Sequence, residues 1–133
     1  HDGARPMVTP ELIGRTIDAA ARSGAASAAV KPKDSYIVGK DEKIQCTLNR
    51  DELYSLQTPQ TFRYDILMAA HENAAKEGFV GTDDTALVKR MGVDVALVEG
   101  SYDNIKLTTP EDLLLANLLI GKNNNSNEWR FPC

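Results

Sequence analysis

The sequence predicts an α/β fold with a Rossmann-like mixed sheet, because segments with helix signals alternate with segments rich in strand formers along its 133 residues. Four segments predict helices, whereas only two predict sheet strands and two more a short hairpin. Two sheet strands are too few for four helices to pack against. We therefore expect a partial fold that begins inside a doubly wound sheet, with further strands supplied upstream of His1.

The composition predicts a soluble domain with one modest core. Apolar residues make up 42% of the chain, and the formal net charge is −4. This acidic balance argues against nucleic-acid or membrane-surface partners, and no apolar run is long enough to span a bilayer. Cys46 and Cys133 show neither metal-site spacing nor a disulfide framework, so we expect reduced thiols. We expect a cytoplasmic location, with a plastid left open.

The first predicted element is a helix. Thr9 is a good N-cap, Pro10 suits the first helical position, apolar residues then recur at helical spacing, and Gly24 is the expected stop. Residues 25–30 follow as a strand, because small residues before a charged loop suit a buried strand between helices. Residues 36–38 and 44–48 flank a polar turn and predict a projecting hairpin.

Two helices are predicted next. The first covers about residues 64–76 and ends at Gly78. The second begins at Thr82, which we expect to be its N-cap, with Asp83 and Asp84 in the first turn where the helix dipole favours acids.

The remaining chain predicts a strand and a last helix. Residues 93–98 form the best strand pattern of the sequence. Thr109 then caps a helix with Pro110 at its first position and Gly121 as its stop. The Asn-rich residues 122–133 are expected to form a disordered tail.

Three polar motifs indicate phosphate chemistry. They are residues 1–5, 57–60 and 104–106, which combine an acid and bases with small residues. Such groups gather in open α/β folds where strands end and loops begin. Together they look like half of a phosphate-handling active site. His1 and His71 favour structural roles.

With these motifs, the chain resembles the C-terminal half of the 2-C-methyl-D-erythritol 4-phosphate cytidylyltransferase family. The resemblance covers almost all of residues 1–121. It rests on His1-Asp2-Gly3-Ala4-Arg5-Pro6, Asp34-Ser35, Leu48-Asn49-Arg50, Gln57-Thr58-Pro59-Gln60, Thr82-Asp83-Asp84, Glu99-Gly100-Ser101 and the run from Asn104 to Asp112. Several ordered motifs at compatible spacing are more specific than any single one.

The resemblance implies a fold of the nucleotide-diphospho-sugar transferase type. Residues 1–121 would be the C-terminal part of a single domain, with residues 34–50 as a hairpin arm. The family's Gly-rich loop, which cradles the CTP triphosphate, has no counterpart in this sequence, so we expect the fragment alone to be inactive.

The implied reaction is attack of a phosphate oxygen of methylerythritol phosphate on the α-phosphorus of CTP, with magnesium present and pyrophosphate released. A phosphate monoester has its second pKa at about 6, so no general base is required. Catalysis then depends on alignment and on neutralising charge.

The resemblance also implies residue roles at one end of the pocket. Lys106 would stabilise the charge at the α-phosphorus, whereas composition alone favours a solvated lysine. Asp2 would orient substrate hydroxyls or help to hold magnesium. The alternative is a purely structural role for Asp2, as a helix-capping or turn aspartate. Arg5 would neutralise substrate phosphate. Asp2 and Lys106 are thus the candidate catalytic and cofactor-binding residues.

Four further residues match family positions that grip the sugar phosphate: Ser35, Arg50, Thr58 and Thr82. Ser35 replaces the more usual threonine and keeps its hydroxyl. Thr82 can serve both as a helix cap and as part of an anion site.

A homodimer is implied as well, because in this family the arm crosses a two-fold axis and Ser35 and Arg50 complete the partner's pocket. The run Lys31-Pro32-Lys33 departs from the family pattern and leaves the register of the arm open.

Two other functions stay open on the sequence alone. A ribitol or ribulose 5-phosphate cytidylyltransferase shares the early Asp and Arg and the Thr-Pro-Gln segment. The motifs that begin at Thr82 and at Asn104, however, follow the usual form of the methylerythritol phosphate enzymes more closely. A non-catalytic α/β interaction module is the third hypothesis, supported only by the missing nucleotide loop.

Overall fold

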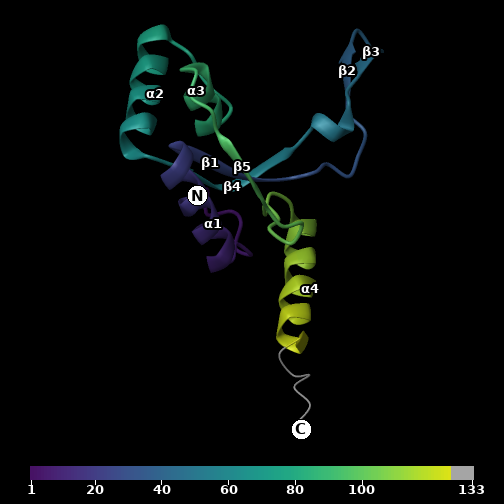
Figure 1. Ribbon diagram of the computed structural model, residues 1–133. Helices are drawn as coiled ribbons and strands as arrows, with labels where there is room; N and C mark the ends of the chain where they lie inside the picture. Colours follow the sequence, from purple (N-terminus) through teal and green to yellow (C-terminus); the bar gives the residue numbers. More distant parts are fainter. Residues whose placement is uncertain (127–133) are drawn as a thin grey trace.

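The computed structural model describes residues 1–126, and Figure 1 shows how their helices and strands are arranged. The elements are α1 (Pro10–Ser23), β1 (Ala25–Val30), β2 (Ile37–Lys40), β3 (Lys43–Thr47), the 3₁₀ turn η1 (Arg50–Glu52), β4 (Ser55–Phe62), α2 (Tyr64–Glu77), α3 (Asp84–Arg90), β5 (Ala96–Glu99) and α4 (Pro110–Ser126). Within residues 1–126, no helix has the length and apolar character that crossing a bilayer requires.

The main sheet has the strand order β4-β1-β5. Its central strand β1 runs antiparallel to β4 and parallel to β5, so the predicted α/β class with a mixed sheet is confirmed. The small side chains of β1 are almost completely buried, which allows helices to approach both faces of the sheet closely.

Successive residues of β1 belong to different apolar clusters, as the pleat of a strand requires. Ala26 and Ala28 pack with Leu12 of α1. Ala25 packs instead with α2 and α3, where Val88 is fully buried. The two clusters place α1 on one face of the sheet and α2 with α3 on the other.

Strand β4 (Ser55–Phe62) is present in the structure, although the sequence pattern did not predict a strand there. Residues 57–60 were treated only as a polar motif, but they lie within β4. Proline and polar residues weaken strand propensity, yet the register between β1 and β4 shifts here, and proline is tolerated at such a bulge. Pairing with β1 overrides the weak local signal.

Helix α1 begins and ends as predicted. The Thr9 hydroxyl accepts a hydrogen bond from the Leu12 amide at 3.2 Å, and Pro10 is the first helical residue. Gly24 closes the helix in the left-handed conformation with φ 87°. The positive φ favours glycine, and a Cβ at Gly24 would lie 2.6 Å from Ile66 Cδ1, so the end of that side chain would also have to shift.

The predicted cap of α3 is wrong. Thr82 precedes the helix, and Asp83 caps it by accepting a hydrogen bond from the Ala86 amide at 2.9 Å. The Asp83 carboxylate also accepts from the Thr85 hydroxyl at 2.6 Å. An ionised acceptor at the positive end of a helix is stronger than a hydroxyl, which explains why the aspartate takes this role.

Two other boundaries differ from the prediction. Strand β5 covers Ala96–Glu99 and not residues 93–98, and α4 runs through Gly121 to Ser126. Gly121 is not among the residues with positive φ, so it does not provide the left-handed stop that was expected. Of the predicted disordered tail, residues 122–126 continue the helix and residues 127–133 lie outside the described part of the chain.

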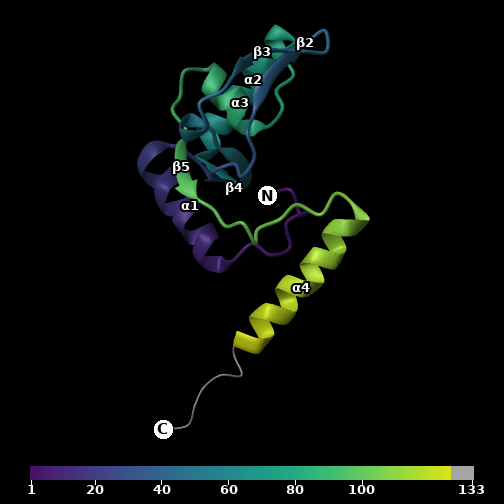
Figure 2. The same ribbon diagram turned by 90° about the vertical axis from the view of Figure 1, so that its right-hand side faces the viewer.

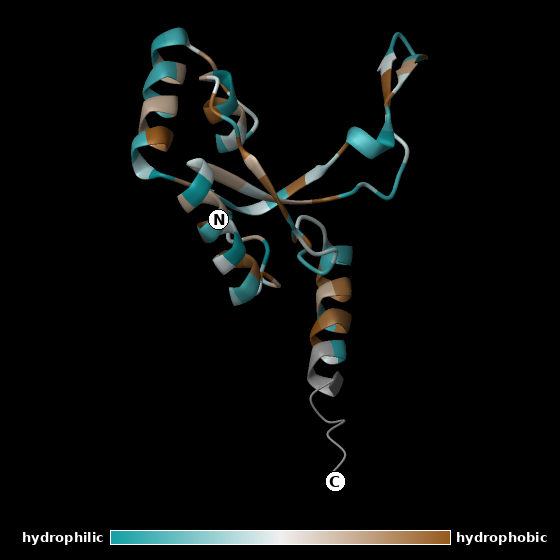
Figure 3. Ribbon diagram, in the orientation of Figure 1, coloured by the Kyte–Doolittle hydropathy of each residue, from teal (hydrophilic) through white to brown (hydrophobic). Residues whose placement is uncertain are grey.

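The predicted hairpin is present as β2 and β3, which project away from the main sheet (Figure 1). Its turn residues Asp41 and Glu42 have positive φ, and both strands are exposed. Helix α4 also leads away from the sheet, and Figure 3 shows apolar residues along it. Its Leu114 and Leu118 are 68% and 71% exposed.

The first turn of α4 is held by Asp112. Its Oδ2 accepts hydrogen bonds from the amides of Thr108 and Thr109, both at 2.8 Å, and from the Thr108 hydroxyl at 3.0 Å. These bonds favour the charged carboxylate and lower the pKa of Asp112 below its ordinary value of 3.8. The contribution of Asp112 to stability is therefore fully present above pH 3.8 and is lost as the pH falls through the lower folded pKa.

We predict that an NMR titration will place the Asp112 carboxyl pKa below 3.8. Replacing Asp112 by Asn should speed hydrogen exchange at the Thr108 and Thr109 amides at neutral pH, because the amide oxygen is a weaker acceptor than a carboxylate. Glu111→Gln, in the same helical turn, is the matched control. An Asp112 pKa at or above its ordinary value would show that the carboxylate does not cap α4.

Candidate functional site

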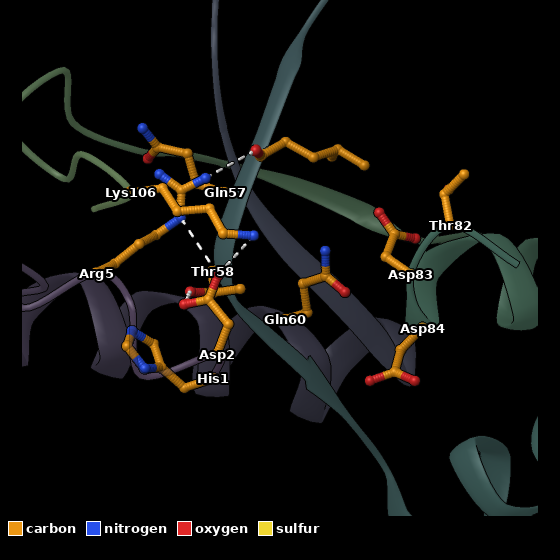
Figure 4. A pocket seen from close by; sticks show the side chains of 11 residues that line it. His1, Asp2, Arg5, Gln57, Thr58, Gln60, Thr82, Asp83, Asp84 and Lys106 are labelled. Carbon is orange, nitrogen blue, oxygen red and sulfur yellow. Dashed lines mark hydrogen bonds and ion pairs between the residues drawn. The ribbon is translucent and has the colours of Figure 1, made fainter. Parts of the chain in front are cut away.

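A cavity of about 430 Å³ lies between the N-terminal segment, β4, the start of α3 and the loop before α4 (Figure 4). Its lining residues are His1, Asp2, Arg5, Leu56, Gln57, Thr58, Gln60, Thr82, Asp83, Asp84 and Lys106. Five of the seven residues predicted for the site are therefore brought together: Asp2, Arg5, Thr58, Thr82 and Lys106.

The Asp2 carboxylate lies at the centre of the charged groups (Figure 4). Its Oδ1 accepts a hydrogen bond from the Thr58 hydroxyl at 3.2 Å. Its Oδ2 lies 3.6 Å from Lys106 Nζ and 4.0 Å from Arg5 Nε. The Lys106 side chain is 51% exposed, and ion pairs of this kind are weak, so a phosphate can take the place of Asp2 beside the lysine.

Arg5 is held more firmly than Lys106. Its Nη1 donates to the Asn104 carbonyl oxygen at 2.6 Å, and its Nη2 donates to the Leu56 carbonyl oxygen at 3.4 Å. Burial lowers the pKa of Arg5 below its ordinary value, and the neighbouring Asp2 carboxylate opposes that shift. An arginine stays protonated in proteins, so Arg5 provides a fixed positive charge at the pocket wall.

A buried amide network lies behind the charged residues. Asn104 and Gln57 are 1% and 6% exposed. Asn104 Nδ2 donates to Gln57 Oε1 at 3.3 Å and to the Thr58 carbonyl oxygen at 2.8 Å. Gln57 in turn exchanges hydrogen bonds with the backbone of Ser101, donating to its carbonyl oxygen at 2.8 Å and accepting from its amide at 3.3 Å. The network joins β4 to the loop that carries Lys106.

Gly100 makes room for this network. A Cβ at Gly100 would lie 2.3 Å from Gln57 Oε1 and 3.2 Å from the Ala29 carbonyl oxygen. The Gln57 amide is hydrogen-bonded to Ser101 and Asn104, so moving it away from a Cβ at Gly100 would break the network. Gln57, Gly100 and Asn104 lie within motifs of the sequence but were assigned no role there, because their neutral side chains carry no local signal for one.

Ser35 and Arg50 do not reach this pocket. Ser35 precedes β2 and Arg50 begins η1, so both lie at the base of the projecting hairpin, and both are exposed. The family resemblance assigns them to a partner subunit's pocket. Within a single chain, neither Ser35 nor Arg50 lines the pocket.

Sequence reasoning missed several residues that line the pocket. Asp83 and Asp84 place two acids at the start of α3, and Asp84 Oδ1 pairs with His71 Nε2 at 2.9 Å. His1 also lines the pocket, and its Nδ1 accepts a hydrogen bond from the Gly3 amide at 3.1 Å. The Thr82-Asp83-Asp84 motif could have indicated the two acids, because it lies at a helix N-terminus that faces the site.

The pocket could hold a magnesium ion only with help from substrate phosphates. Within the described residues, no three His, Cys, Asp or Glu side chains gather into a metal cage. Magnesium, however, is commonly bound through one or two carboxylates together with substrate phosphates. Asp2 provides one such hard oxygen ligand, so the donor set fits an ion that is held mainly by phosphates.

These features define a class of protein. Basic side chains lie around one carboxylate at the edge of a mixed α/β sheet, and side chains of this kind are suited to binding phosphate groups. Comparison with known families then identifies the class more closely. The family model for 2-C-methyl-D-erythritol 4-phosphate cytidylyltransferase (IspD) matches residues 1–122, and the chain belongs to this family.

Individual relatives agree with this assignment. The 2-C-methyl-D-erythritol 4-phosphate cytidylyltransferase of Shouchella clausii is 48% identical over 94% of this chain and 55% of its own length. The protein of the same name from Caldanaerobacter subterraneus subsp. tengcongensis is 50% identical over 92% of this chain and 54% of its own length. The chain thus spans about half the length of the curated relatives it matches.

Solved structures show the same fold. The 2-C-methyl-D-erythritol 4-phosphate cytidylyltransferase of Thermus thermophilus superposes with a TM-score of 0.81 at 39% identity, over 90% of this chain and 59% of that one. The 4-diphosphocytidyl-2C-methyl-D-erythritol synthase of Anaerococcus prevotii gives a TM-score of 0.84 at 37% identity, over 91% of this chain and 55% of that one. The predicted nucleotide-diphospho-sugar transferase type of fold is confirmed.

Proposed function

We propose that this chain forms the acceptor-binding half of a cytidylyltransferase. The complete protein transfers the cytidylyl group of CTP to 2-C-methyl-D-erythritol 4-phosphate and gives 4-diphosphocytidyl-2-C-methyl-D-erythritol and pyrophosphate, in the non-mevalonate route to isoprenoids. The observation that supports this most strongly is the convergence of Asp2, Arg5, Thr58 and Lys106 on one pocket in a chain of this family. The bacterial relatives support a cytoplasmic location.

The chemistry needs charge neutralisation more than proton transfer. An oxygen of the acceptor phosphate forms a bond to the α-phosphorus of CTP, and the bond from that phosphorus to the pyrophosphate oxygen breaks. Lys106 exchanges its weak contact with Asp2 for the phosphate groups and stabilises the charge that develops there. Asp2 then orients acceptor hydroxyls together with Thr58, to which it is already hydrogen-bonded.

Arg5 and Thr82 hold the acceptor phosphate from two sides of the pocket. Arg5 offers a guanidinium whose position is fixed by two carbonyl oxygens. Thr82 lies just before α3 and lines the pocket, where its hydroxyl provides a hydrogen-bond donor for a phosphate oxygen. A magnesium ion bound through Asp2 and the nucleotide phosphates would supply further neutralisation of the triphosphate.

The rest of the protein, equivalent to the other half of the relatives, supplies the CTP-binding loop. Two features of this chain support a packing surface for that remainder. Strand β4 lies at an edge of the sheet within the described residues, and the leucines of α4 are exposed. A further strand beside β4 and a cover for α4 would complete the fold.

The hairpin arm supports a homodimer. Ser35 and Arg50 lie away from their own pocket, yet a forked guanidinium and a hydroxyl are suited to a phosphate. A second copy of the protein that receives this arm would place both residues in its pocket.

Kinetics of the full-length protein test the function. We predict pyrophosphate release from CTP with methylerythritol phosphate but not with ribitol 5-phosphate. Lys106→Ala should lower kcat by about 100-fold or more, because it removes charge stabilisation in the transition state. Arg50→Ala should mainly raise KM for the acceptor, because it removes a binding contact. Lys76→Ala, which changes a lysine of α2 outside the pocket, is the control.

Turnover with ribitol 5-phosphate alone would replace the proposed acceptor. Absence of turnover with either acceptor would contradict the function, and equal, small effects of Lys106→Ala and Arg50→Ala would contradict their separate roles.

Mixing two impaired variants, assayed at an acceptor concentration far below the KM of Arg50→Ala, tests the dimer. If the arm acts on the partner, a subunit with Lys106→Ala and a subunit with Arg50→Ala combine into a dimer with one intact site. Random pairing of equal amounts should restore about a quarter of wild-type activity. An arm that serves its own subunit would leave the mixture no more active than the average of the two variants.

A further inference from the structure

One buried residue connects three segments that line the pocket. Asn104 lies between the N-terminal segment, β4 and the loop before α4, and it is 1% exposed. We infer that Asn104 is a positioning residue: it sets the relative placement of Arg5, Thr58 and Lys106 without contacting the substrate. The inference rests on the proposed cytidylyl transfer for its kinetic consequence, but its structural part does not.

The side chain of Asn104 binds β4 in one orientation only. Its Nδ2 donates to the Thr58 carbonyl oxygen at 2.8 Å and to Gln57 Oε1 at 3.3 Å. The Gln57 amide is itself oriented by Ser101, because Nε2 donates to the Ser101 carbonyl oxygen and Oε1 accepts from its amide. Both partners of Asn104 are therefore acceptors, and only a donor fits between them.

The backbone of Asn104 holds the other two segments. Its carbonyl oxygen accepts from Arg5 Nη1 at 2.6 Å. Lys106 lies two residues after Asn104. The next residue, Leu107, donates its amide to the Ala4 carbonyl oxygen at 2.8 Å. Figure 2 shows this loop running beside the N-terminal segment. Lys106 is thus held between two fixed points, and a shift of Asn104 moves Lys106 and Arg5 together.

The chemical nature of the residue is as important as its size. An alanine at position 104 leaves the two acceptors on β4 without this donor. An aspartate of nearly the same shape turns a carboxylate oxygen toward both of them, which is repulsive. Neither change alters a side chain that lines the pocket, since Asn104 is not among the lining residues.

The test uses the full-length protein with Asn104→Ala and Asn104→Asp. Val88→Ala is the control, because Val88 is fully buried in the cluster with α2 and α3 and outside the pocket. All assays are made well below the lowest unfolding temperature. We expect each Asn104 variant to lower kcat by about tenfold or more with KM for CTP little changed, and Val88→Ala to keep kcat within about twofold.

A double-mutant cycle separates positioning from general destabilisation. If Asn104 acts through Lys106, Asn104→Ala should have little further effect on kcat in a protein that already carries Lys106→Ala. Additive effects in this cycle, or equal losses in the Asn104 variants and Val88→Ala, would overturn the inference. If Asn104→Ala does not fold, Asn104→Asp is used in the cycle.

Binding of inorganic phosphate separates this inference from the proposed function. Calorimetry at low salt should show phosphate binding about tenfold weaker in Asn104→Asp than in the parent, with Val88→Ala unchanged. This result would support the positioning role even if CTP is not turned over. Unchanged phosphate binding in Asn104→Asp would overturn the role whatever the protein catalyses.

Discussion

The buried contact between Asn104 and Gln57 is the interaction on which the candidate site depends. Each amide lies in the interior, where an unpaired polar group costs about 1–3 kcal/mol. The Asn104 Nδ2 group and both ends of the Gln57 amide are hydrogen-bonded to one another and to nearby backbone groups, although Asn104 Oδ1 is buried without a partner, and these bonds hold the loop before α4 against β4. This contact adds to the backbone bond between Leu107 and Ala4 and to the Arg5 bonds, which join the same segments.

The sheet makes the contact possible. Strand β1 is built of small residues, so α1 packs against one of its faces and α2 with α3 against the other. Antiparallel pairing of β1 with β4 places Thr58 beside the N-terminal segment. Parallel pairing of β1 with β5 places the loop that follows β5 at the same end of the sheet. The charged groups can then stay partly exposed and weakly paired, as a site that exchanges ligands requires.

Local signals predicted much of the fold, and tertiary contacts decided the rest. Helix α1 was predicted correctly because Thr9, Pro10 and Gly24 act within their own helix. Strand β4 was missed because Pro59 weakens its propensity and only pairing with β1 stabilises it. Five residues that line the pocket were predicted from ordered motifs. The role of Asn104 was not, because a neutral amide acquires a function only from the groups packed around it.

The central claim is that the pocket around Asp2 and Lys106 holds the reacting phosphates. A crystal structure of the full-length protein with CTP tests it most directly. We expect the α-phosphate in this pocket, with Lys106 Nζ about 3 Å from one of its oxygens and no longer paired with Asp2. A nucleotide bound elsewhere, with Lys106 still beside Asp2, would contradict it.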